Sequence, residues 1–251
     1  MALVSLAPLM TLAPLMTLAP LMTLAPLMTL AALMIVGVLA RVGGPATVIW
    51  QTSNDGTSAT ADSWRRCYPD RTVQVLNDSA REAFVRGTRW ERTWPHLLPI
   101  HRADIFRYIA LWRYGGIYAD TDAACAQPLP RTGGLTVGLE SNITDAALAR
   151  YVRQRHMGQY VQWTFAAAQP RHPALKRVLD DIYASPITKE VLNYTGPIAF
   201  TRSIVALAGG DVHVLPKCAF AATGFPTTVC APESVYVHHG YEGSWVTELR
   251  R

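Results

Sequence analysis

The chain has 251 residues, of which 50% are hydrophobic and 16% are charged, and its formal net charge is +5. This modest basic excess fits anionic substrates or a membrane-proximal surface. Since no run of Lys and Arg is interleaved with aromatic residues, the sequence argues against nucleic-acid binding. The glycine-rich junction ending at Pro45 predicts an apolar leader over residues 1–45 and one folded domain over residues 46–251.

The leader has no charged side chain before Arg41 and repeats Leu-Ala-Pro-Leu-Met-Thr four times over residues 6–29. Its apolar length exceeds the roughly 20 residues that a helix needs to cross a bilayer, although the repeated prolines disfavour a straight helix. We therefore predict a membrane anchor, drawn mostly from about residues 18–40, with a cleaved signal peptide as the alternative. No Lys or Arg precedes this segment, so its orientation is not specified.

The four cysteines lack the Cys-x-x-Cys spacing of a zinc site. In an oxidising compartment Cys218 and Cys230 could close a short loop, and four free buried thiols are the alternative. N-glycosylation triplets begin at Asn77, Asn142 and Asn193, which gives weak support to a luminal location.

Strands and helices are expected to alternate in the folded part. A strand over residues 47–50 leads into a polar loop that begins at Gln51, and a second strand covers residues 72–76. A capping box at residues 79–82 opens a helix that closes near Gly87. This alternation predicts an α/β sandwich with a largely parallel sheet, in which ligands lie at the carboxyl ends of the strands.

The most informative part of the chain begins with a helix predicted from Arg102 to Tyr114, along which apolar residues recur at helical spacing. Asp104 and Arg107 lie three residues apart in this helix, so a carboxylate and a guanidinium are neighbours. A structural salt bridge on the helix surface is the alternative to a functional role for this pair.

The helix should end at Gly115-Gly116, since a left-handed residue is least costly as glycine, and residues 117–119 should form a short buried strand. Asp120 and Asp122 follow it and point the same way, because side chains alternate along an extended chain. Two carboxylates that leave other coordination positions open suit Mn²⁺ or Mg²⁺ bridging to phosphate oxygens. A solvated turn after the strand is the alternative.

Later elements follow the same α/β pattern. Strands are expected over residues 135–140, 212–215 and 235–237, and helices over residues 172–183 and from Pro197 onward. The last strand delivers His238 and His239, one of which could complete the coordination of the ion. His239 is favoured because it lies farther from the strand, and a surface histidine is the alternative.

Together these segments resemble glycosyltransferase family 32, the DXD-containing sugar transferases, and within it the fungal initiation-specific α-1,6-mannosyltransferases. The tripeptide Gln162-Trp163-Thr164 favours enzymes acting on N-glycans over those acting on sphingolipids. The matching segments are residues 49–52, 102–108, 115–122, 162–164, 172–173, 195–197, 237–239 and 243–245.

The resemblance implies a GT-A-type nucleotide-sugar-binding fold, a Rossmann-like mixed sheet flanked by helices. It implies a Mn²⁺-dependent retaining transfer of mannose from GDP-mannose to an N-linked oligomannose glycan, by a Golgi membrane protein with a luminal catalytic domain. The alternatives are transfer to inositol phosphoceramide or another glycolipid, a catalytically silent glycan-binding homologue, and secretion or another membrane compartment.

The resemblance also assigns roles to residues. Asp104 would accept hydrogen bonds from sugar hydroxyls, Arg107 would orient the sugar or the diphosphate, and both would act in catalysis with Asp120 and Asp122. For Trp50, which could stack on the base, and Trp163, which could support the acceptor, burial in the core is the alternative. The predicted sets are Trp50, Gln51, Asp104, Arg107, Tyr108, Gly116 and Asp120 for the donor, Trp163 and Gly196 for the acceptor, and Asp120, Asp122 and His239 for the metal.

Overall fold

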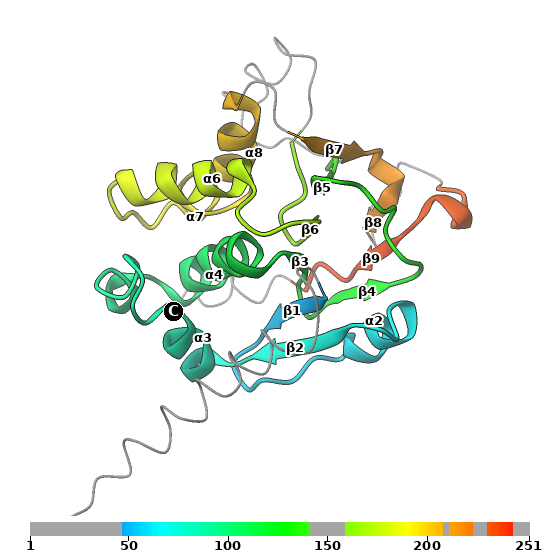
Figure 1. The fold of residues 1–251 in the computed structure, drawn as a ribbon, viewed down its shortest axis with the longest axis horizontal. Coiled ribbons are helices and arrows are strands. Elements are labelled where there is room, and N and C mark those ends of the chain that lie inside the picture. The colour runs from blue at the N-terminus through cyan, green and yellow to red at the C-terminus, as the bar shows by residue number, and fades with distance from the viewer. Residues whose placement is uncertain (1–46, 141–158, 208–210, 223–229, 243–251) are drawn as a thin grey trace, which may run out of the picture.

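A computed structural model describes residues 47–140, 159–207, 211–222 and 230–242. Its described residues form a six-stranded sheet with strand order β2-β1-β3-β6-β5-β7 and a three-stranded sheet with order β4-β9-β8 (Figure 1). The strands of the large sheet are β2 (Thr72–Leu76), β1 (Val48–Thr52), β3 (Gly116–Ala119), β6 (Thr164–Ala167), β5 (Leu135–Gly138) and β7 (Val212–Leu215).

The large sheet is mixed. Three of its neighbouring pairs, β2–β1, β1–β3 and β5–β7, are parallel. Strand β6 runs against both of its neighbours, β3 and β5. The mixed α/β fold inferred from the resemblance is therefore confirmed. The largely parallel sheet expected from alternation is also confirmed, since five of the six strands share one direction and β6 is the exception, which its sequence pattern does not reveal.

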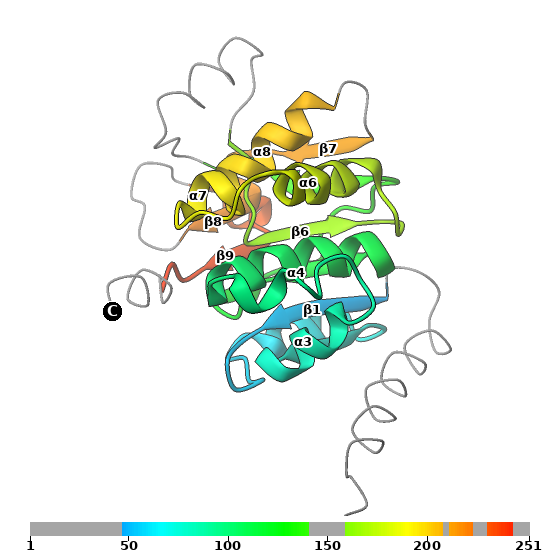
Figure 2. The same ribbon diagram turned by 90° about the vertical axis from the view of Figure 1, so that its left-hand side faces the viewer.

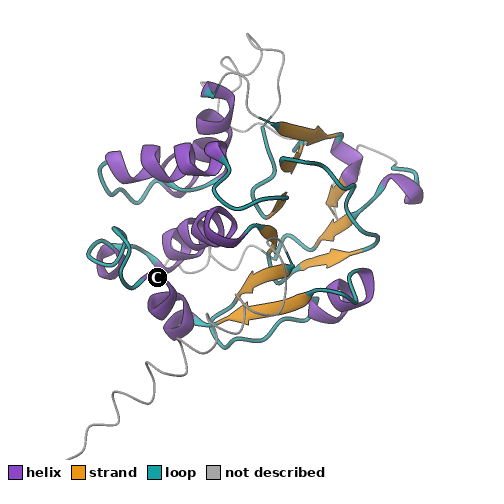
Figure 3. Ribbon diagram, viewed as in Figure 1, coloured by secondary structure: helices purple, strands orange, loops and turns teal. Residues whose placement is uncertain are grey.

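Helices cover one face of the large sheet, and Figure 2 shows α3, α4, α6 and α8 in front of its strands. The opposite side carries α2 and the three-stranded sheet (Figure 3). The helices are α2 (Ala61–Cys67), α3 (Asp78–Val85), α4 (Pro99–Tyr114), α6 (Pro173–Ala184), α7 (Val191–Tyr194) and α8 (Pro197–Ala206), and single 3-10 turns cover Trp94–His96, Lys217–Ala219 and Pro232–Ser234.

Both faces of the central strands are buried, which explains their nearly continuous apolar sequence. In β1, Val48 and Trp50 belong to the core beneath the helices, whereas Ile49 belongs to the core on the other side. In β3, Tyr118 faces the helices and Ile117 faces away from them. This alternation is the two-residue period of an extended chain. It lets one sheet contribute side chains to the core under the helices and to the core on the opposite side.

The helix ends agree with the sequence prediction with two exceptions. Helix α4 begins at Pro99, three residues before the predicted start, because proline suits the first position of a helix. Helix α3 is capped by Asn77, whose Oδ1 accepts a hydrogen bond from the backbone N of Ala80 at 2.9 Å, and not by the predicted box at Ser79. At the other end of α4, Gly115 has a φ of 67° and Gly116 a φ of 98°, as the predicted glycine stop requires.

The small sheet consists of β4 (Ala123–Cys125), β9 (Val237–His239) and β8 (Phe220–Ala222). Strand β9 was expected at residues 235–237, but it covers Val237–His239 and follows a 3-10 turn at Pro232–Ser234. Strand β4 begins directly after Asp122 and pairs antiparallel with β9, with Ala123 opposite His239. The sequence pattern had indicated neither β4 nor this pairing.

All four cysteines form disulfides. The predicted alternative of a Cys218–Cys230 bridge is confirmed, and a second bridge, Cys67–Cys125, was not foreseen because its partners are 58 residues apart. This second bridge joins the end of α2 to β4, so it fastens the strand that follows Asp122 to the layer below.

None of the described helices combines the length and the apolar character that a membrane span requires. The predicted leader, the triplet at Asn142 and the matching segment at residues 243–245 lie outside the described residues.

Gly116 offers a test of the β1–β3 contact. A Cβ atom there would lie 2.2 Å from the carbonyl oxygen of Val48, and its φ of 98° is unfavourable for any other residue. Gly116→Ala should lower the free energy of unfolding by about 1–3 kcal/mol through backbone strain and by about 1–3 kcal/mol more through overpacking.

Gly87→Ala is the matched control, because Gly87 has a φ of 71° with nothing within 4 Å of the added Cβ. It should cost only the strain of a positive φ. Urea denaturation monitored by circular dichroism measures both variants. Equal losses would contradict the predicted close contact with β1.

Candidate active site

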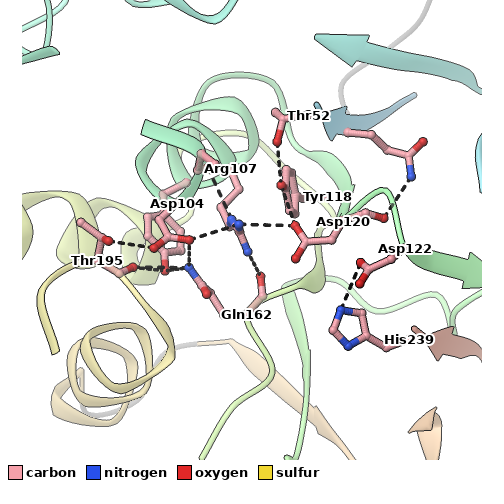
Figure 4. Close-up of polar contacts among 12 residues, drawn as sticks. Thr52, Asp104, Arg107, Tyr118, Asp120, Asp122, Gln162, Thr195 and His239 are labelled. Atoms are coloured by element: carbon pink, nitrogen blue, oxygen red, sulfur yellow. Dashed lines mark hydrogen bonds and ion pairs between the residues drawn. The ribbon is translucent and has the colours of Figure 1, made fainter. Parts of the chain in front are cut away.

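Three potential ligands meet where the two sheets join. Asp120 follows β3, Asp122 precedes β4 and His239 ends β9. One ligand atom from each lies within 4.8 Å of the others, and Nε2 of His239 is 3.2 Å from Oδ1 of Asp122 (Figure 4). The sequence-based expectation that the two carboxylates could share one ion with His239 is therefore met in geometry.

The chain after β9 wraps around Asp122. The backbone N of Gly240 donates to the carbonyl oxygen of Asp122 at 2.9 Å, and the backbone N of Glu242 donates to its Oδ2 at 3.1 Å. Burial raises the pKa of Asp122. The interaction with His239 and the hydrogen bond from the backbone N–H of Glu242 lower it by more, so the pKa of Asp122 lies below its usual range. Asp122 is therefore an anion at neutral pH.

Asp120 is oriented by groups from three elements. Tyr118 donates its hydroxyl to Oδ1 of Asp120 at 2.8 Å, and Nη2 of Arg107 lies 3.3 Å from the same oxygen. The side-chain amide of Gln51 donates to the carbonyl oxygen of Asp120 at 3.2 Å, and the backbone N of Asp120 donates to the carbonyl of Trp163 at 2.8 Å. These contacts fix the carboxylate before any ligand arrives.

Arg107 connects Asp120 to the helix layer. Its Nη2 lies 3.1 Å from Oδ1 of Asp104 as well as near Asp120, and its Nη1 donates to the carbonyl oxygen of Gln162 at 3.0 Å. The guanidinium lies over the ring of Tyr118, 4.6 Å from its centroid. Burial opposes its charge, but the neighbouring carboxylates Asp120 and Asp104 outweigh that effect and raise the pKa of Arg107.

Asp104 is only 2% exposed, and both of its oxygens are bonded. Oδ1 accepts from Nε2 of Gln162 at 2.8 Å, and Oδ2 accepts from the hydroxyl of Thr195 at 2.7 Å. Burial raises its pKa, while Arg107, Thr195 and Gln162 oppose that rise. The structure thus brings Asp104 and Arg107 together as a buried ion pair, and direct contact between Asp104 and a sugar hydroxyl stays a prediction.

Three residues predicted to touch the donor lie in the core. Trp50 is 1% exposed and donates its Nε1–H to the carbonyl of Gly115 at 3.1 Å, so neither ring face can stack on a base, and the core-packing alternative holds. Tyr108 is fully buried and donates its hydroxyl to the carbonyl of Thr195 at 2.8 Å. Gly116 is buried against Val48. We therefore correct these three assignments from donor contacts to core residues that pack beneath the site.

The two predicted acceptor residues are also buried. Trp163 is 7% exposed, and its ring stacks on His239 with centroids 4.1 Å apart and an interplanar angle of 6°. It supports the imidazole, in agreement with the alternative of a buried tryptophan. Gly196 caps α8 in the interior, where a Cβ atom would lie 2.9 Å from the carbonyl of Val191. It is corrected from an acceptor contact to a turn residue.

Sequence reasoning missed three residues that organise the site, namely Tyr118, Gln162 and Thr195. Tyr118 could have been found, because it precedes Asp120 by two residues in the strand and so points the same way. Gln162 and Thr195 lie in segments that carried the family resemblance, but nothing local indicates that both reach Asp104.

The donor set fits a divalent cation. Two carboxylates suit Mg²⁺ and Mn²⁺ alike, while the nitrogen ligand from His239 weighs against Mg²⁺, which prefers oxygen. Mn²⁺ is therefore the better match to these three side chains.

The chain is similar to known proteins. Residues 55–143 match the family described as "Glycosyltransferase sugar-binding region containing DXD motif". The chain is 28% identical to the initiation-specific α-1,6-mannosyltransferase of Schizosaccharomyces pombe over 79% of this chain and 63% of that protein. It is 32% identical to the mannosyl phosphorylinositol ceramide synthase of Saccharomyces cerevisiae over 33% of this chain and 24% of that protein. The solved PaToxG glycosyltransferase has a TM-score of 0.44 and 15% identity, covering 72% of this chain and 79% of that one.

The family match and the acidic motif within it define the class of the protein, which is a glycosyltransferase. More particularly, residues 55–143 match the DXD-containing sugar transferases, and the chain is similar to fungal initiation-specific α-1,6-mannosyltransferases. It spans 63% of the length of the S. pombe enzyme, so that enzyme's activity, substrates and partners apply to this chain as proposals.

The Asp104 network predicts the effect of removing one hydroxyl. Thr195→Val deletes the donor to a buried carboxylate oxygen and should lower the free energy of unfolding by about 1–3 kcal/mol. Thr195→Ser keeps the hydroxyl and serves as the control, with an expected loss below about 1 kcal/mol. Chemical denaturation measures both. A serine variant as unstable as the valine variant would mean that the methyl group, and not the hydrogen bond, matters.

Proposed function

We propose that this protein is a retaining, metal-dependent glycosyltransferase that moves mannose from GDP-mannose to an N-linked oligomannose glycan through an α-1,6 linkage. The convergence of Asp120, Asp122 and His239 at the junction of the two sheets carries the proposal. The similarity to the initiation-specific α-1,6-mannosyltransferase of S. pombe supports the sugar and the linkage.

The residues divide the work by charge. Asp120, Asp122 and His239 would hold Mn²⁺, or Mg²⁺, which as a Lewis acid offsets the charge that develops on a departing diphosphate. Arg107 supplies a permanent positive charge beside Asp120, and its 4% exposure reduces the screening of that charge by water. Tyr118 fixes the carboxylate of Asp120, so the site is organised before the donor binds.

A glycolipid acceptor is the second candidate. The specific observation in its favour is the 32% identity to the mannosyl phosphorylinositol ceramide synthase of S. cerevisiae, although it extends over only 33% of this chain. A catalytically silent glycan-binding protein is a weaker candidate, since such a protein would have no use for the complete set of Asp104, Arg107, Asp120 and Asp122.

We further propose that the catalytic domain lies in the Golgi lumen, anchored by the leader over residues 1–45. Both pairs of cysteines are oxidised, which fits a secretory compartment. The charge-free sequence before Arg41 supports membrane attachment.

Assay of the full chain with a panel of donors tests the reaction. GDP-mannose with Mn²⁺ should support transfer to an oligomannose acceptor, whereas UDP-sugars should not, and chelation by EDTA should abolish turnover until Mn²⁺ is restored. Inositol phosphoceramide in place of the glycan tests the second candidate. Turnover that persists in EDTA would overturn the metal dependence, and absence of turnover with every donor would support the silent homologue.

Removing either acidic ligand should abolish transfer without unfolding the protein. Asp120→Asn and Asp122→Asn should each reduce the rate by roughly 10²–10³ or more, because each removes charge from the metal site. The thermal transition of Asp122→Asn should stay nearly unchanged, whereas Asp120→Asn should also lower stability, because it removes one of the two carboxylates beside the buried Arg107. Asp62→Asn is the control, since the Asp62 side chain is 78% exposed on α2. Full activity in either site variant would remove the metal assignment.

A further inference from the structure

A second polar cluster lies against the metal triad, and the proposed chemistry does not use it. It consists of Glu140, Tyr241 and Gln159. Tyr241 lies between Gly240 and Glu242, whose backbone N–H groups both bond to Asp122. The side chain of Tyr241 is therefore positioned by the same backbone that holds a predicted metal ligand.

Tyr241 combines an exposed ring with a fixed position. It is 37% exposed, and its ring meets the His239 ring edge to face with centroids 4.2 Å apart. Its φ of 53° is rare for a residue with a side chain and persists only where surrounding contacts enforce it. Here those contacts are the hydrogen bonds around Asp122 and the hydroxyl of Tyr241, which donates to Oε1 of Glu140 at 3.1 Å.

Glu140 follows β5 and is partly buried. Its Oε2 accepts a hydrogen bond from Nε2 of Gln159 at 2.6 Å, so each oxygen has one protein donor. Burial raises its pKa, and the hydrogen bonds from Gln159 and Tyr241 oppose that rise. A carboxylate oxygen has two lone pairs and can accept a further hydroxyl.

We propose that Tyr241 and Glu140 form the subsite that binds the acceptor hexose, with the ring of Tyr241 against its C–H face and Glu140 accepting one of its hydroxyls. This inference rests on the proposed function and names residues for the acceptor. An apolar ring face beside a hydrogen-bonded carboxylate matches a pyranose, which presents C–H groups on its faces and hydroxyls at its rim.

The position of the cluster separates it from the donor contacts. Figure 4 shows Arg107 and Asp104 extending from Asp120 in one direction and His239 lying beyond Asp122 in the other. Tyr241 packs on His239, so the cluster lies on the Asp122 side of the triad. A donor whose diphosphate meets the ion near Arg107 leaves this opposite side for the attacking sugar.

The proposal replaces Trp163 with Tyr241 as the aromatic contact. Trp163 is 7% exposed and stacks on a face of the His239 imidazole, whereas Tyr241 is 37% exposed and packs edge to face against the same imidazole. The ring centroids of Trp163 and Tyr241 lie 6.4 Å apart, and Tyr241 is the more exposed of the two.

Kinetics of the full chain with Mn²⁺, GDP-mannose and an oligomannose acceptor test the subsite. Tyr241→Ala and Glu140→Gln should each raise the acceptor KM roughly tenfold or more. The donor KM, donor hydrolysis without acceptor and the Mn²⁺ concentration for half-maximal activity should stay within about twofold. Glu140→Gln should fold, because Oε1 of Gln159 has no hydrogen-bond partner among the described residues and can accept from the new amide after rotation.

Two variants serve as matched controls. Glu242→Gln makes the same chemical change at an exposed neighbour of Tyr241 whose backbone, not its side chain, contacts Asp122. Tyr183→Ala removes another exposed tyrosine, on α6, that is 47% exposed. Both should leave the acceptor KM unchanged. Tyr241→Phe, which keeps the ring, should give a smaller rise than Tyr241→Ala.

An unchanged acceptor KM in both site variants would overturn the subsite. An equal rise in donor KM or in the Mn²⁺ requirement would also overturn it, because Tyr241 would then act through the donor or through His239. Calorimetry with the oligomannose, GDP and Mn²⁺ gives an independent readout that needs no turnover. If the unmodified chain turns over no donor, the proposed reaction fails, and loss of oligosaccharide binding in the variants still decides the subsite.

Discussion

The buried guanidinium of Arg107 is the interaction on which the site depends. It lies between Asp104 in the helix layer and Asp120 at the end of β3, and it is 4% exposed. Removing one partner from such a buried pair costs about 3–5 kcal/mol, because the charge that remains has no compensation. The buried charge of Asp104 is further compensated by hydrogen bonds, because Gln162 and Thr195 each donate to one of its carboxylate oxygens. The same network that stabilises the interior therefore fixes the carboxylate of Asp120, the first proposed metal ligand.

The second acidic ligand depends on a different part of the chain. Asp122 is held by backbone from residues 240–242 and by His239, which reach it only because β4 and β9 pair. The Cys67–Cys125 bridge fastens β4 to α2, and the stacking of Trp163 fixes the imidazole of His239. The supports of Asp120 and Asp122 thus come from different parts of the chain and share Trp163, whose carbonyl oxygen accepts from the backbone N of Asp120 and whose ring stacks on His239.

This construction gives the site two chemically different sides. The Asp120 side is dominated by a buried positive charge and suits the anionic half of a nucleotide-sugar. The Asp122 side carries an exposed aromatic ring and a hydrogen-bonded carboxylate, which suit a neutral sugar. A transferase needs both substrates beside one ion, and the arrangement of charge offers a place for each.

The sequence by itself determined the parts of this protein that depend on neighbours along the chain. Helix α4 and its glycine stop follow from helical spacing and from the freedom of glycine at positive φ. Asp120 and Asp122 were expected to share a direction through alternation along a strand, but β3 ends at Ala119, and a turn closed by the bond from the backbone N of Ala123 to the carbonyl oxygen of Asp120 brings them together. Tertiary structure decided the direction of β6, the pairing of β4 with β9 and the burial of Trp50 and Trp163. These features depend on residues far apart in the chain, and local periodicity carries no information about which distant strand or side chain a residue will contact.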